Sequence, residues 1–173
     1  MGRSPSLTIL LCEDDAHEQL VRSYLKKIVG YNSRNVRPLN ASRQVHGGNV
    51  GWVLREFPKQ LQACRNRHAH TLLIVIIDAD DFTVDQRSAS LSNEGAFSEA
   101  DPLVLLIPRR HVETWIRVAL GEEVNETATY KKPAPKSKDF STAASQIYQW
   151  VRQIPPPDLR NVPSLLGALP NWR

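Results

Sequence analysis

Acidic side chains follow each of three apolar segments in this 173-residue chain. The residues concerned are Glu13, Asp14 and Asp15, then Asp78, Asp80 and Asp81, and last Glu113. Ionised carboxylates held close together repel one another unless a cation offsets their charge. Mg²⁺, a hard cation with oxygen ligands, is the usual one near phosphates. These residues therefore predict a divalent-cation site that can polarise a phosphoryl oxygen and activate water.

Basic side chains lie beside the third acidic position. Arg109 and Arg110 directly precede His111, and a guanidinium matches a phosphate group in a bidentate way. Residues 1–70 carry a net charge of +6, residues 71–130 of −7 and residues 131–173 of +5. An acidic middle between basic ends fits carboxylates that hold a cation beside surfaces that attract phosphate, with Lys131 and Lys132 as further phosphate-binding candidates. The alternative is a soluble protein whose charges happen to cluster.

Several of these side chains also have a purely structural interpretation. Asp15 is expected to cap a helix together with Glu18, and Asp81 to cap the helix after the central apolar segment. His17 is predicted on a helix surface rather than in a ligand set, and His111 fits either role at a helix start. Glu13, Asp78 and Asp80 follow buried strands directly, so a shared cation is the favoured interpretation for them.

The elements that must position these residues alternate between strand and helix. Continuous apolar runs at 7–12, 71–77 and 103–107 predict buried strands, and a short edge strand is expected within 30–40. The helices expected between and after them span about 15–30, 52–67, 84–93, 112–120 and 143–154, with a short one at 162–169 and a break or kink at Pro58. This pattern predicts an α/β fold with a mostly parallel sheet and helices on both faces. Functional groups collect at the carboxyl ends of such strands, where the acidic residues fall.

Length and composition fit one globular domain. We expect a catalytic domain over residues 1–140, and a C-terminal helix and proline-rich tail over 141–173 that packs on it or on a partner. The longest apolar run, 72–77, is too short to span a membrane, and no signal peptide is expected at the start. Cys12 and Cys64 lack metal-site spacing and are predicted to be reduced, which favours the cytoplasm.

At these residues the sequence resembles the Toprim superfamily, whose members have a glutamate after the first core strand and an Asp-x-Asp after a later one. Glu13 and the pair Asp78 and Asp80 match those positions. The likeness is closest to small stand-alone Toprim-like proteins that resemble the nuclease half of OLD-family proteins, including Gabija-type defence nucleases. The matching segments, in order, are Cys12 to Glu18, Gly47 to Val53, Asp78 to Asp80 and Ile107 to Trp115.

The resemblance implies a Toprim-like, Rossmann-like fold and Mg²⁺- or Mn²⁺-dependent phosphodiester hydrolysis, with DNA as the expected substrate. It implies that Asp78 and Asp80 hold the metal, that Glu13 is a ligand or general acid/base, and that Glu113 occupies a later acidic position. Asp14, also a candidate ligand, stands where Toprim proteins usually have glycine. The chain contains no Walker motif, whereas OLD-type nucleases work with an ABC-type ATPase. A separate ATPase partner, a homo-oligomer and a role in anti-phage defence or DNA repair are therefore hypotheses that rest on the resemblance.

Two other functions remain open. The segment Leu10 to Asp15 is similar to the first strand and acidic pair of response-regulator receivers, with Asp78 as phosphoacceptor and Lys132-Pro133 as the lysine-proline pair. Against this, Asp78 lies 63 residues after Asp15, where ordinary element lengths give about 40. In addition, Pro108 stands where a receiver has Ser or Thr. The other possibility is a non-catalytic adaptor that keeps the fold and binds a partner or nucleic acid.

Overall fold

The computed structural model describes residues 5–28, 31–46, 49–67 and 70–172. The strands are β1 (Leu7–Cys12), β2 (Val36–Asn40), β3 (Thr71–Ile76) and β4 (Leu103–Leu106). The helices are α1 (Asp15–Leu25), α2 (Asn49–Arg65), α3 (Val84–Glu94), α4 (Val112–Ala119), α5 (Ser137–Trp150) and α6 (Pro163–Ala168). Short 3₁₀ turns cover Ser33–Asn35, Ala41–Arg43 and Leu169–Trp172. Within these ranges no helix has both the length and the apolar character needed to cross a membrane.

The strands form one parallel sheet in the order β2-β1-β3-β4. In its register Cys12 pairs with Ile76 of β3, and Ile76 pairs in turn with Leu106 of β4. The carboxyl ends of β1, β3 and β4 therefore lie at the same level. The residues that follow these three strands start from neighbouring points on one edge of the sheet.

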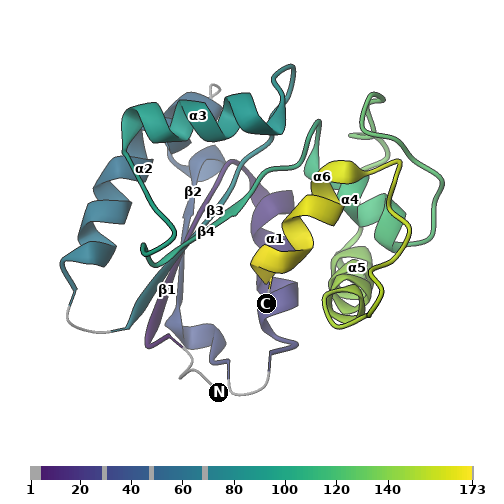
Figure 1. Cartoon of the computed structure of the whole chain (residues 1–173), viewed down its shortest axis with the longest axis horizontal. Helices are drawn as coiled ribbons and strands as arrows, with labels where there is room; N and C mark the ends of the chain where they lie inside the picture. Colours follow the sequence, from purple (N-terminus) through teal and green to yellow (C-terminus); the bar gives the residue numbers. More distant parts are fainter. Residues whose placement is uncertain (1–4, 29–30, 47–48, 68–69, 173) are drawn as a thin grey trace.

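Helices cover both faces of the sheet (Figure 1). On one face Ile9 and Leu11 of β1 pack in a cluster with apolar side chains of α2 and α3. On the other face Leu10 and Cys12 pack in a cluster with side chains of α1, α4, α5 and α6. Successive side chains of a strand point to opposite faces, so a continuous apolar run supplies both cores. The expected α/β fold with a parallel, doubly covered sheet is confirmed.

The expected elements differ from the observed ones in detail. The edge strand expected within 30–40 is β2, and α2 runs as one helix through Pro58 rather than starting a second helix there. Gly30, at the expected end of the first helix, and Gly47 and Gly48, at the start of the second Toprim-like segment, lie outside the described residues. Cys12 and Cys64 are both free and buried, in agreement with the predicted reduced thiols.

The C-terminal segment packs on the sheet domain. The division expected between residues 140 and 141 falls inside α5, whose Phe140 and Ile147 belong to the same core as α1 and α4. The ring of Trp172 lies 4.4 Å from that of Tyr24, centroid to centroid, and its carbonyl accepts a hydrogen bond from the Tyr24 hydroxyl. The tail thus helps to cover the face formed by α1 and α4.

Candidate metal centre

Two of the three strand ends meet through a direct hydrogen bond. The Glu13 carboxylate, just after β1, accepts a hydrogen bond of 2.6 Å at Oε1 from the backbone N–H of Asp78, just after β3. Both side chains are buried, with exposed fractions of 8% for Glu13 and 4% for Asp78. Burial raises the pKa of Glu13 to about 7; the nearby His17 opposes that rise and the charge of Asp78 adds to it. Glu13 is therefore poised to exchange a proton near neutral pH.

His17 lies inside the site, which corrects the prediction that it is on a helix surface. Only 1% of its surface is exposed. Its Nδ1 lies 2.7 Å from Asp14 Oδ1 and its Nε2 lies 3.0 Å from Asp78 Oδ1. Burial alone would lower the pKa of His17, but these two carboxylates raise it well above its ordinary value. His17 therefore serves as a buried positive charge between Asp14 and Asp78.

Asp14 caps helix α1, where the sequence favoured Asp15. The Asp14 side chain accepts hydrogen bonds from the backbone N–H groups of Ala16 and His17 and also binds the His17 ring. The oxygen Oδ1 thus serves the helix terminus and the histidine, so the predicted ligand role is not needed to explain this residue. Asp15 instead pairs with Arg43 at 2.7 Å, on the outer side of the helix start.

Asp80 and His111 form the second half of the site. His111 is the N-cap residue of α4 and is buried, and its Nδ1 lies 3.6 Å from Asp78 Oδ2 and 4.0 Å from Asp80 Oδ1. The backbone of Asp80 has φ of +54°, the left-handed conformation that aspartate tolerates better than most residues. Burial would raise the pKa of Asp78, but His17 and His111 lower it on balance. Asp78 is therefore an ionised carboxylate between two imidazoles.

Two arginines hold the backbone of the loop that carries both aspartates. The buried Arg87 of α3 donates from Nε to the carbonyl of Asp78 at 3.0 Å and from Nη2 to that of Ala79 at 3.3 Å, and its Nη2 lies 3.8 Å from Asp80 Oδ2. Arg109 donates from Nη1 to the carbonyls of Asp80 and Phe82. The predicted phosphate clamp at Arg109 is thus engaged in positioning this loop. Arg87 was not identified from the sequence.

The other basic candidates lie further out. Arg110 pairs with Asp81 on the surface, and the predicted cap at Asp81 is wrong because Thr83 caps α3 in a reciprocal capping box with Gln86. Lys131 and Lys132 are exposed in the segment before α5. The carbonyl of Lys132 accepts a hydrogen bond from Arg117 of α4.

Glu113 stands in the first turn of α4, two residues after His111. Burial raises the pKa of its carboxyl, and the negative charge of Asp78 adds to the rise. Glu113 is thus electrostatically coupled to the site. It does not belong to the groups of donor atoms close enough to share one ion within the described ranges.

Two groups of donor atoms in the described structure could hold a metal ion. One consists of Glu13, His17 and Asp78, and the other of Asp78, Asp80 and His111, so that Asp78 belongs to both. Within each group the donor atoms lie within 4.8 Å of one another. The predicted cation site at the carboxyl edge therefore has suitable donors. These include an imidazole nitrogen of His17, which was not predicted as a ligand, and one of His111, for which both roles were left open.

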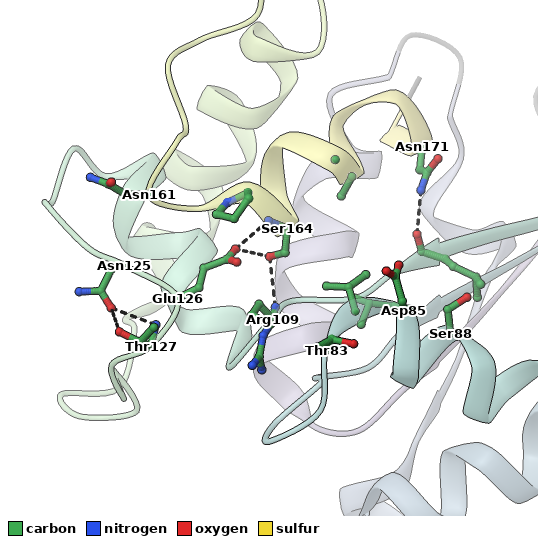
Figure 2. A pocket seen from close by; sticks show the side chains of 16 residues that line it. Thr83, Asp85, Ser88, Arg109, Asn125, Glu126, Thr127, Asn161, Ser164 and Asn171 are labelled. Carbon is green, nitrogen blue, oxygen red and sulfur yellow. Dashed lines mark hydrogen bonds between the residues drawn. The ribbon is translucent and has the colours of Figure 1, made fainter.

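A cavity of about 770 Å³ lies beside the loop that follows β4 (Figure 2), and none of the residues of the two donor groups lines it. It lies between the end of β4, the start of α3 and helix α6, and Arg109 forms part of its wall. Ser164 of α6 fixes this wall, because its Oγ accepts hydrogen bonds from the Arg109 backbone N–H at 3.1 Å and from Trp115 Nε1 at 2.8 Å, and donates to Glu126. The network connects α4, α6 and the loop that follows β4.

No protein-family model, curated protein or solved structure was found to match this chain. The relationship to Toprim proteins therefore stays a prediction from the sequence motifs.

Proposed function

We propose that this chain is a Toprim-type metal-dependent nuclease that hydrolyses phosphodiester bonds in DNA, with Mg²⁺ or Mn²⁺ as cofactor. The observation that carries the proposal is the convergence of Glu13, Asp78 and Asp80 at the carboxyl edge of a parallel sheet, with Asp78 common to two groups of metal-binding donors. Parallel α/β sheets place their ligands at this edge. When bound there, a divalent cation would polarise a phosphoryl oxygen and lower the pKa of a water molecule.

In this proposal Glu13 accepts the proton of the attacking water. A general base works best when its pKa lies near the working pH, and the pKa of Glu13 is about 7. Asp78 is kept ionised chiefly by the nearby His17, as a metal ligand must be. Glu113 lies close enough to Asp78 for their charges to interact and would support a second cation once a phosphate is bound.

The proposal gives the basic side chains different roles. Arg109 positions the Asp78–Asp80 loop through its carbonyl contacts, whereas Arg110, with 31% of its side chain exposed, would meet the phosphate. Lys131 and Lys132 would attract the nucleic acid at longer range. An ABC-type ATPase partner, a homo-oligomer and a place in phage defence or DNA repair belong to the proposal on the strength of the sequence resemblance alone.

A receiver-type switch fits this geometry less well. The proposed phosphoacceptor, Asp78, is 4% exposed, and its two carboxylate oxygens face His17 and His111. Lys132 stands in a loop rather than at a strand end. Access of a phosphodonor to Asp78 would require both imidazoles to move.

The experiment is cleavage of supercoiled plasmid by the purified chain in Mg²⁺, in Mn²⁺ and in EDTA. Asp78→Asn and Glu13→Gln are compared with Glu94→Gln, an exposed acidic residue of α3 that serves as the matched control. The proposal expects metal-dependent nicking by the wild type and by Glu94→Gln, and loss of nicking in the two site variants. Equal nicking by the wild type and Asp78→Asn would refute it. Absence of nicking by the wild type would favour the adaptor function, to be checked by adding an ATPase recovered with the chain from its host.

A further inference from the structure

The two donor groups that share Asp78 differ in how their histidines are bonded. In the Glu13, His17 and Asp78 group, both ring nitrogens of His17 already lie within hydrogen-bond distance of carboxylates. A metal ion could bind His17 only by breaking one of these contacts and displacing a buried positive charge. The hydrogen bonds therefore make His17 an internal partner of Asp78 rather than a metal ligand.

His111 is in the opposite situation. Its side chain is 7% exposed, and Nδ1 has no hydrogen-bond partner among the described residues. A buried polar nitrogen without a partner is costly and calls for an explanation. Asp78 Oδ2 lies 3.6 Å from Nδ1 and Asp80 Oδ1 lies 4.0 Å from it, and both oxygens are too far for a hydrogen bond. Ligands bound at about 2.1 Å to one ion lie roughly 3 to 4 Å from one another. The two distances from His111 Nδ1 fall in this range and suit a shared ion.

The two carboxylates are also oriented for such an ion. Asp78 uses Oδ1 for His17 and turns Oδ2 toward His111. Asp80 turns Oδ2 toward Arg87 and Oδ1 toward His111. Each carboxylate thus has one oxygen next to a protein cation and presents the other to the same point.

We propose that Asp78 Oδ2, Asp80 Oδ1 and His111 Nδ1 form the cation position of this site, and that the imidazole ligand makes it selective for a first-row transition dication over Mg²⁺. Imidazole nitrogen suits ions such as Fe²⁺, Ni²⁺ and Zn²⁺, whereas Mg²⁺ takes oxygen ligands almost exclusively. The inference concerns the same site as the proposed nuclease and refines its cofactor. It can nevertheless be tested without nucleic acid or turnover.

The test is Mn²⁺ binding to the full chain after removal of metals with EDTA. Electron paramagnetic resonance of free Mn²⁺ gives the affinity, and electron spin echo envelope modulation detects a ¹⁴N nucleus bonded to the ion. We expect a nitrogen signal in the wild type, its loss in His111→Asn with an affinity at least about tenfold weaker, and its retention in His17→Gln. His46→Asn, which changes an exposed histidine, is the matched control and is expected to behave as the wild type. Mg²⁺ is expected to displace Mn²⁺ only at an excess of roughly tenfold or more.

The results separate this inference from the nuclease proposal. Bound Mn²⁺ without a nitrogen signal, a signal that survives in His111→Asn, or displacement by an equal concentration of Mg²⁺ would each overturn it. Metal-dependent nicking together with any of these results would leave the nuclease intact and remove only the histidine ligand. Wild-type selectivity between Mn²⁺ and Mg²⁺ needs no variant, so the test holds even if His111→Asn fails to fold.

Discussion

Arg87 offers a direct test of how the Asp78–Asp80 loop is held in place. This residue of α3 donates hydrogen bonds to the backbone carbonyls of Asp78 and Ala79. The substitution Arg87→Met keeps much of the side-chain volume and removes every donor. We expect the variant to fold with reduced stability and with the Asp78–Asp80 loop less firmly positioned.

The size of the effect follows from the hydrogen bonds that the substitution removes. A hydrogen bond with a charged partner contributes about 1.5 to 3 kcal/mol, and the 3.3 Å hydrogen bond to Ala79 belongs at the lower end. The Asp80 carboxylate, 3.8 Å away, would also lose its nearby positive charge. The variant no longer bears the desolvation cost of a buried guanidinium, and this gain offsets part of the lost stability. The net destabilisation is therefore about 3 kcal/mol. With a urea m-value of about 2 kcal/mol/M, the unfolding midpoint should fall by about 1.5 M.

The assay is urea unfolding in EDTA, followed by far-ultraviolet circular dichroism. Arg55→Met, at an exposed position of α2, is the matched control and should change stability by less than about 0.5 kcal/mol. Arg87→Lys keeps the charge but reaches fewer acceptors, so its loss should fall between the other two. A loss below about 1 kcal/mol in Arg87→Met, or a loss equal to that of Arg55→Met, would refute the assigned role.

Two further predictions concern other parts of the site. Ser164→Ala leaves the indole N–H of Trp115 without its acceptor, so calorimetry should show that the free energy of unfolding falls by about 2 kcal/mol. The control Ser145→Ala on α5 should lower it by less than about 0.5 kcal/mol, and equal losses would contradict the network. Burial would raise the pKa of Asp14, but the hydrogen bonds of its carboxylate to His17 and to the start of α1 hold the pKa at about 2. The contribution of Asp14 to stability is therefore complete above pH 3.8 and is lost as the pH falls toward 2. Asp14→Asn keeps the capping oxygen, so the stability that the protein loses between pH 5 and pH 2 should be smaller by about 1 kcal/mol in this variant; this value allows for solvent screening, because the Asp14 side chain is 43% exposed. An unchanged dependence of stability on pH would rule out the contribution.

The fold could be predicted from the sequence because β1, β3 and β4 are continuous apolar runs, a pattern typical of strands covered on both faces. The placement of Glu13, Asp78 and Asp80 near one another followed from the same pattern, since parallel strands end on one edge. The capping residue of α1 could not be chosen in this way. Asp14 and Asp15 are adjacent and equally suited to cap a helix, and the extended backbone of Asp14 decides between them.

His17 and Arg87 were missed because each occupies a helix position that usually holds an apolar residue. His17 stands three and four residues before Leu20 and Val21, so it continues the buried face of α1 by one turn. Arg87 stands four residues before Leu91 on the buried face of α3. A charged residue on such a face is seldom buried without a partner, and this signal was available in the sequence. The identity of the partner requires the tertiary structure.

His17 and Arg87 also explain how the site can fold before any metal binds. Buried carboxylates without compensation would repel one another and take up protons. Here His17 lies between Asp14 and Asp78, and Arg87 holds the backbone of the loop and faces Asp80. The protein therefore supplies the positive charge needed to bury these groups. His17 and Arg87 do not neutralise the two carboxylate oxygens that face His111, namely Asp78 Oδ2 and Asp80 Oδ1. A cation that binds there meets side chains already held in place, so little of its binding energy is spent on ordering them.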